Sequence, residues 1–124
     1  MPETPFVQWL IDCCGMVAGL EKEAAAALHA DDPEEYRRIM LEKALLLAAL
    51  YEDAMPLLSS LPCEHARTAS DRLQRFSDSA ARSLELESVF YMAALLFPED
   101  HAEGKPNDLE QFCDELRLRL AKKG

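Results

Sequence analysis

The chain has 124 residues, of which 49% are hydrophobic, and its 23 acidic and 13 basic side chains leave a net charge of −10. This length is typical of one domain with a single core. The acidic surplus argues against nucleic acids and membranes as partners, because binding to their phosphates needs Lys and Arg. No apolar stretch reaches the roughly 18–20 residues of a membrane helix. The longest, residues 6–20, does not resemble a signal peptide.

The four cysteines are Cys13, Cys14, Cys63 and Cys113. Two of them are neighbours in the sequence, and the spacing of the others is not that of a disulfide framework. We therefore expect reduced, buried thiols in a cytoplasmic protein.

The first predicted helix covers residues 5–29. Thr4 is a good N-cap, and Pro5 stands at the first helical position, where its missing N–H costs nothing. Apolar residues then recur at steps of three and four, which predicts one buried helical stripe. The stripe consists of Phe6, Leu10, Cys13, Val17, Leu20, Ala24 and Leu28. Gly15 and Gly19 favour either a close helix crossing or a bend in this segment.

The second predicted helix covers residues 33–55. Asp32 is its N-cap, Pro33 its first residue, and Glu35 completes a capping box. Residues 44–51, ALLLAALY, are apolar on almost every side, which is typical of a helix packed against several neighbours. Pro56 disfavours helical geometry at Met55, so we expect the helix to end there.

The third predicted helix covers residues 63–97, and the sequence leaves open whether it is continuous or bent near residues 77–83. Two pairs at i,i+4 spacing, Asp71–Arg75 and Asp78–Arg82, predict ion pairs on its polar face. A straight helix of this length would measure about 52 Å, which exceeds either preceding helix. The stretch from residue 89 to 97 is apolar on every side.

The last predicted helix covers residues 108–122, after a linker of residues 98–106. Asn107 and Glu110 form a capping box at its start. No segment alternates like a strand. The sequence therefore predicts an all-α fold, an antiparallel up-and-down bundle of four helices, or five if the third one divides.

No catalytic constellation or phosphate-binding loop is recognisable, so we expect neither enzymatic activity nor a cofactor. One alternative is a thiol- or metal-dependent site. Cys63 and His65 offer soft and borderline ligands, and Cys13 would lie at the same end of an up-and-down bundle. The spacing of the three residues matches no standard zinc motif.

The large number of apolar residues favours a different function, namely protein binding. Apolar side chains beyond the needs of a four-helix core can form a groove for a partner's amphipathic helix or the interface of a homodimer. We expect a chaperone-like or adaptor-like interaction module. The candidate contact residues are Leu46, Leu50, Phe90, Tyr91 and Leu95.

Residues 17–53 resemble the front half of FlgN-type flagellar export chaperones of bacteria. The similarity is carried by Leu20-Glu21-Lys22-Glu23, by Leu28, by Asp31-Asp32 and by the segment from Leu41 to Leu46. This resemblance implies an acidic helical chaperone that holds amphipathic segments of structural subunits before their export.

Overall fold

The computed structural model describes residues 4–98, 100–102 and 104–122. Within these ranges the chain is helical and contains no strand, so the all-α prediction is confirmed. The elements are α1 (Pro5–His29), α2 (Pro33–Ala54), the short 3₁₀ helix η1 (Met55–Ser60), α3 (Cys63–Glu85), α4 (Val89–Ala94) and α5 (Asp108–Lys122). None of the described helices is long and apolar enough to cross a membrane.

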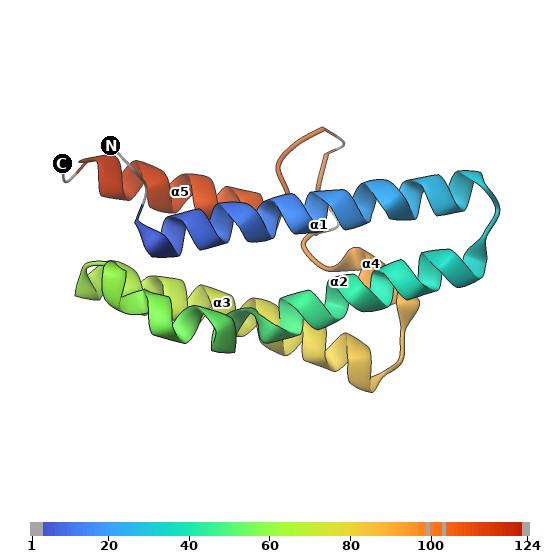
Figure 1. Cartoon of the computed structure of the whole chain (residues 1–124), viewed down its shortest axis with the longest axis horizontal. Coiled ribbons are helices and arrows are strands. Elements are labelled where there is room, and N and C mark those ends of the chain that lie inside the picture. Colours follow the sequence, from blue (N-terminus) through green and yellow to red (C-terminus); the bar gives the residue numbers. More distant parts are fainter. Residues whose placement is uncertain (1–3, 99, 103, 123–124) are drawn as a thin grey trace.

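The long helices run up and down, as Figure 1 shows. α1 and α2 form an antiparallel hairpin, α3 returns along α2, and α5 lies beside the first half of α1. α5 also reaches α3 through side chains. The rings of Phe76 and Phe112 lie 6.3 Å apart, and Arg72 forms an ion pair of 3.5 Å with Glu115. The much shorter α4 packs against α2 and α3 instead, so α4 and α5 share the remaining side of the bundle.

The predicted helix starts are confirmed by their hydrogen bonds. Thr4 Oγ1 accepts from the backbone N–H of Val7 at 3.2 Å, and Asp32 Oδ1 accepts from that of Glu35 at 3.2 Å. At the start of α5, Asn107 and Glu110 exchange two bonds of 2.9 Å, which is a complete capping box. Local side-chain chemistry therefore sets where these three helices begin.

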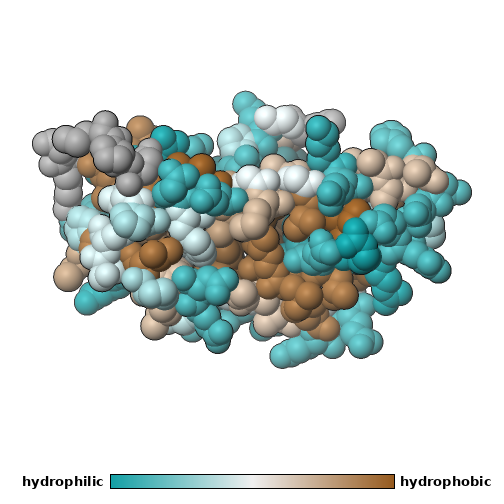
Figure 2. Space-filling model, viewed as in Figure 1, coloured by the Kyte–Doolittle hydropathy of each residue, from teal (hydrophilic) through white to brown (hydrophobic). Residues whose placement is uncertain are grey.

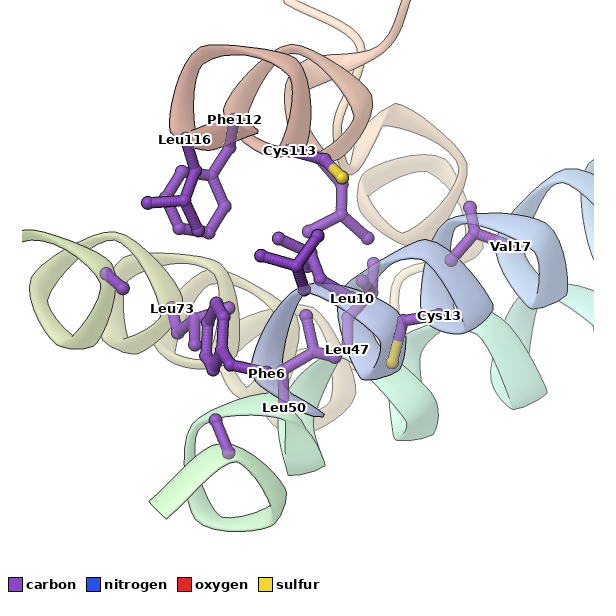
Figure 3. Packing of buried hydrophobic residues seen from close by; sticks show 14 of the residues in the cluster. Phe6, Leu10, Cys13, Val17, Leu47, Leu50, Leu73, Phe112, Cys113 and Leu116 are labelled. Atoms are coloured by element: carbon purple, nitrogen blue, oxygen red, sulfur yellow. The ribbon is translucent and has the colours of Figure 1, made fainter. Parts of the chain in front are cut away.

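Buried apolar side chains form two clusters. The larger one joins α1, α2, α3 and α5, and Figure 3 shows side chains of these helices directed toward a common centre. The smaller cluster joins the second half of α1, the first half of α2, and α4. Its buried members are Ala24, Ala27, Ile39, Met40, Ala44 and Met92. Met92 is the buried member that α4 contributes, and Val89 and Ala93 of the same helix also pack against this cluster.

The structure divides the predicted helix of residues 63–97 into two helices, which is the five-helix alternative. α3 ends at Glu85, and a turn with Glu87 at φ 50° leads into α4, where Ser88 Oγ accepts from the N–H of Tyr91 at 3.2 Å. A single 35-residue helix would project beyond its neighbours, whereas the turn folds Met92 back into the smaller cluster. The bend left open near residues 77–83 is absent. There Ser77 Oγ donates to Leu47 O and accepts from the N–H of Tyr51, both at 3.0 Å, and this ties α3 to α2.

Other local expectations also differ from the structure. Gly15 and Gly19 have no atom within 4 Å of where a Cβ would stand, so no helix approaches them closely. Neither Asp71–Arg75 nor Asp78–Arg82 is among the ion pairs within 4.0 Å in the described residues. The segment after Ala54, for which the sequence predicted only the end of a helix, is the 3₁₀ helix η1.

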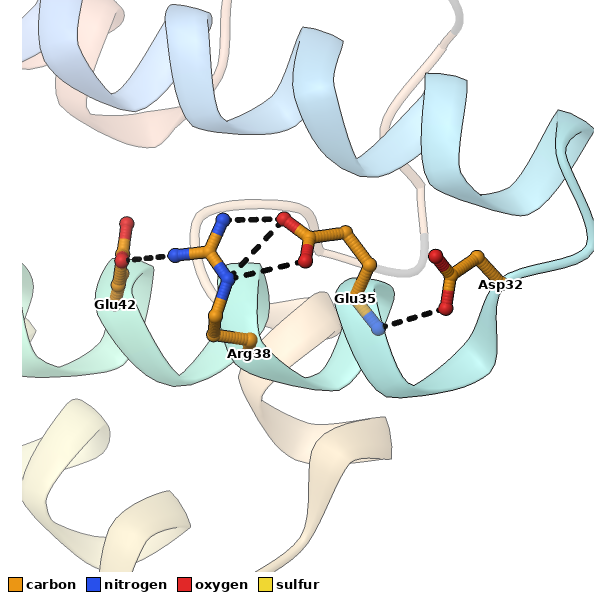
Figure 4. A network of polar contacts seen from close by, with 4 residues as sticks. All are labelled: Asp32, Glu35, Arg38 and Glu42. Atoms are coloured by element: carbon orange, nitrogen blue, oxygen red, sulfur yellow. Dashed lines mark hydrogen bonds and ion pairs between the residues drawn. The ribbon is translucent and has the colours of Figure 1, made fainter.

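A polar network covers the solvent face of α2 near its start (Figure 4). The Arg38 guanidinium binds the carboxylates of Glu35 and Glu42, one turn away on either side. The Arg38 guanidinium lowers the pKa of Glu35 through hydrogen bonding and charge. Exposed pairs of this kind contribute little to stability, since water screens them. Its effect is therefore a small stabilisation of the first turns of α2.

Candidate functional site

A groove of about 600 Å³ lies between the second half of α3 and residues 91–98. Its lining is mainly apolar, with a few polar groups, which is the usual composition of a binding site. The apolar lining residues are Leu47, Phe76, Leu86, Tyr91, Ala94, Leu95, Leu96, Phe97 and Pro98. The polar lining residues are Asp78, Ser79, Arg82, Ser83 and Asp108.

Two aromatic side chains stand exposed beside this groove. Phe90 is 77% exposed and Tyr91 53% exposed, and their rings form an edge-to-face pair with centroids 5.6 Å apart. Leu86, in the turn before α4, is 58% exposed. Large contiguous apolar patches are uncommon on the surfaces of monomeric proteins, and those that occur are often interaction sites.

A second, smaller groove of about 290 Å³ includes residues of α2 and of the α3–α4 turn. Arg37, Leu41, Leu84, Glu87, Val89 and Met92 line it. On the molecular face shown in Figure 2, apolar surface gathers below the middle of α1 and over α2. α4 thus supplies lining residues to both grooves, and the exposed residues of α2 and α4 extend the apolar area around them.

The position of α4 depends on a buried lysine in α2. Lys43 is fully buried, and its ammonium lies 3.1 Å from the carbonyl oxygen of Ala93, in the last turn of α4. The same ammonium lies 2.6 Å from Glu21 Oε1 on α1 and 5.0 Å from the centroid of the Phe97 ring. Apart from this ion pair, Glu21 Oε1 has no hydrogen-bond partner. Lys43 therefore connects α2 to α1 and to the C-terminal end of α4. A positive charge at that end also interacts favourably with the helix dipole.

Burial governs the charge state of this lysine. Loss of hydration lowers the pKa of the Lys43 ammonium, and the hydrogen bond and charge of Glu21 only partly oppose this effect. The carboxylate of Glu21 and the carbonyl oxygen of Ala93 both contact the ammonium, which offsets part of the cost of burying its charge. The structure thus holds a titratable group at the junction of the two apolar clusters.

The groove also contains a strained backbone position. Leu96 has φ 74°, a left-handed conformation that a leucine rarely adopts, and its side chain is buried. Its carbonyl oxygen accepts from the backbone N–H of Asp108 at 3.0 Å, which connects the groove to the start of α5. Strain of this kind persists only where surrounding contacts hold it, and it is frequent at functional sites.

The predicted contact residues have different environments. Tyr91 and Leu95 line the larger groove, and Phe90 is exposed next to it. Leu46 is half-buried and packs against the larger cluster. Leu50 is only 1% exposed, so it is a core residue in this structure and offers no surface to a partner.

Three residues of this region were not predicted from the sequence, namely Leu86, Leu96 and Lys43. For Lys43 a signal was present, because it stands three residues after Met40 and four before Leu47 on the buried stripe of α2. A charged residue at such a position requires a buried partner. No comparable local signal marks Leu96, whose conformation depends on the tertiary fold.

The alternative thiol or metal site finds no support in the geometry. Within the described residues, no group of three or more His, Cys, Asp or Glu side chains could hold a metal ion. Cys63 is exposed at the start of α3, whereas His65 is buried with Nε2 lacking a hydrogen-bond partner. Burial, with Asp53 and Asp12 nearby, raises the pKa of the Cys13 thiol to about 11. A thiol held protonated in this way is a poor nucleophile and a poor ligand.

Comparison of the chain with protein-family models, curated proteins and solved structures finds no match.

Proposed function

We propose that this protein is an interaction module whose larger groove receives the apolar face of an amphipathic helix from a partner protein. The observation that carries the proposal is the exposed pair Phe90 and Tyr91 at the edge of an apolar groove of about 600 Å³. Helix-in-groove recognition uses apolar anchors spaced by three and four residues. Aromatic residues are enriched among the contacts that dominate such interfaces.

Charge indicates what kind of helix would bind. The chain has a net charge of −10, and Asp78 and Asp108 line the groove together with Arg82. Glu87, in the turn before α4, lines the smaller groove. A partner helix with Lys or Arg beside its apolar face would be attracted to this surface, and such complementarity increases the association rate and the specificity.

The similarity of residues 17–53 to FlgN-type export chaperones supports a chaperone form of this proposal. These residues form the hairpin of α1 and α2, which carries Glu21 and Lys43 and thereby supports α4. In that form the partner would be an amphipathic segment of an exported structural subunit. In an adaptor form the partner would be a folded protein with an accessible helix.

A photo-cross-linking amino acid at position 90, in the native cell, tests the proposal. The matched control carries it at position 118, because Leu118 is also apolar and 64% exposed but lies on α5. We expect position 90 to capture one dominant partner through an amphipathic helical peptide, and position 118 not to capture it. Equal capture at both positions, or capture through a non-helical peptide, would refute the groove as the binding site. Capture of a second copy of this chain would replace the partner with a homodimer.

A further inference from the structure

We propose that the outer face of α2 is an interface between two copies of this chain, which pack antiparallel about a two-fold axis at Leu45. Leu45 is 53% exposed, and Leu41, one turn earlier, is 42% exposed. Ala49, one turn later, is half-buried, and Figure 2 shows apolar surface over α2. In the part of the chain that the structure describes, neither leucine belongs to the two apolar clusters. The core of a single chain therefore does not use them.

The charges along this face reverse their sign about Leu45. Arg38 precedes Leu45 by seven positions, and Glu52 follows it by seven. Seven residues are nearly two helical turns, so the three side chains stand on one line along α2. An antiparallel second copy would place its Glu52 opposite Arg38, and the two-fold symmetry would repeat this pair at the other end. Leu41 would lie over Ala49 of the second copy, whose small side chain allows a close helix approach.

The charged groups at the two ends of this face remain available to a second copy. Among the described residues, neither Arg37 nor Glu52 forms an ion pair within 4.0 Å. Arg38 binds Glu35 and Glu42 (Figure 4), yet its side chain is still 52% exposed. Charges across an interface fix its orientation and register more than they increase its affinity. They would favour the antiparallel arrangement here, because a parallel one sets arginine against arginine.

This interface would leave the larger groove open. Leu47, which α2 contributes to that groove, stands about 200° around the helix from Leu45. The dimer would therefore carry two larger grooves, and a partner that offers two helices would bind more tightly than one that offers a single helix. The face of one helix makes a small interface, so we expect the dimer to form reversibly.

Sedimentation of the full chain over a range of concentrations tests the proposal. A reducing agent is present, because the exposed Cys63 could otherwise join two chains. We expect a monomer–dimer equilibrium for the original chain and loss of the dimer in Leu45→Glu, where two like charges would meet at the two-fold axis. The matched control is Leu118→Glu, at a residue of α5 that is 64% exposed, and it should associate like the original chain. An original chain that is monomeric at every concentration, or a Leu45→Glu variant that still dimerises, would overturn the proposal and leave this face to another protein.

Two charge reversals test the pairing of Arg38 with Glu52. Arg38→Glu alone and Glu52→Arg alone would each set like charges against one another at both ends of the interface, so each should sediment as a monomer. An equimolar mixture of the two variants should form a heterodimer, because each copy supplies the charge that the other lacks. Both positions are exposed, so circular dichroism should show unchanged helix content. A mixture that stays monomeric, or a single variant that dimerises like the original chain, would overturn the proposal.

Discussion

The ammonium of Lys43 in α2 lies 3.1 Å from the carbonyl oxygen of Ala93 in α4, and this bond fixes the shortest helix of the bundle. α4 has six residues, which is too short to be stable by itself. Its position therefore depends on the buried Met92 and on the Lys43 ammonium. Because Phe90 and Tyr91 stand on this helix, the candidate binding surface depends on a lysine that no solvent reaches.

Replacement of Lys43 tests this dependence. In Lys43→Met we expect the free energy of unfolding to stay within about 1 kcal/mol of the original, because well-packed apolar residues can replace a buried ion pair. Lys43→Ala should lose about 2–5 kcal/mol, because it leaves a cavity. Both variants should show faster amide exchange in residues 89–97 than the original chain. Urea unfolding and hydrogen exchange measure the two effects, and unchanged exchange in both variants would contradict the role assigned to Lys43.

The lowered pKa of Lys43 predicts a particular pH dependence. Between its pKa in the folded state and about 10.5 in the unfolded chain, the unfolded state binds more protons. The free energy of unfolding supplied by this group therefore rises with pH in that window. We expect the difference in stability between the original chain and Lys43→Met to shift in favour of the original chain as the pH rises. A difference independent of pH would mean that the lysine titrates as it does in water.

The raised pKa of Cys13 predicts the opposite dependence of stability on pH. Its pKa is raised from 9.0 to about 11 in the folded protein, mainly by burial. The folded state therefore holds the proton more tightly, and the stability supplied by this group is complete below pH 9 and lost as the pH rises toward 11. Cys13→Ala should flatten this decline in urea unfolding experiments, whereas Cys63→Ala, at an exposed site, serves as the control. An identical decline in the two variants would contradict the burial effect.

Phe90 and Leu50 should respond differently to truncation. Phe90→Ser should leave the free energy of unfolding within about 0.5 kcal/mol, because the side chain is exposed. Leu50→Ala should cost about 2–5 kcal/mol, because its side chain is buried in the larger cluster. Fluorescence of Trp9, the one tryptophan in the chain, reports unfolding for both variants. A large loss of stability in Phe90→Ser would show that the aromatic pair has a structural role.

The strained backbone at Leu96 predicts an unusual order of stability for its glycine and alanine variants. At an ordinary helical site such as Leu73, glycine should be less stable than alanine by about 1 kcal/mol. At Leu96, with φ 74°, the order should be reversed, because glycine adopts this conformation without the penalty that a Cβ adds. Thermal unfolding of the four variants makes the comparison. The same order at both sites would mean that the backbone relaxes away from the left-handed region when the leucine is removed.

Local signals in the sequence were enough to predict most helix ends. Thr4 with Pro5, Asp32 with Pro33, and Asn107 with Glu110 mark the starts of α1, α2 and α5, since each cap bonds to an N–H only a few residues away. The position of the break between α3 and α4 was not predicted. The turn there places Glu87 at positive φ, a conformation that a glycine would have signalled in the sequence. Tertiary contacts account for that turn, namely the burial of Met92 in the smaller cluster and the bond from Lys43 to Ala93.

The sequence by itself determined an acidic, all-helical chain with three capped helix starts and a surplus of apolar residues. The tertiary structure decided which of those residues face water. Leu50 became core and Phe90 became surface, although both belong to apolar stretches. It also brought the Lys43 ammonium to the carbonyl oxygen of Ala93, fifty residues away in the sequence. The reason is physical, since capping bonds span one helical turn, whereas burial depends on segments that are distant in the sequence.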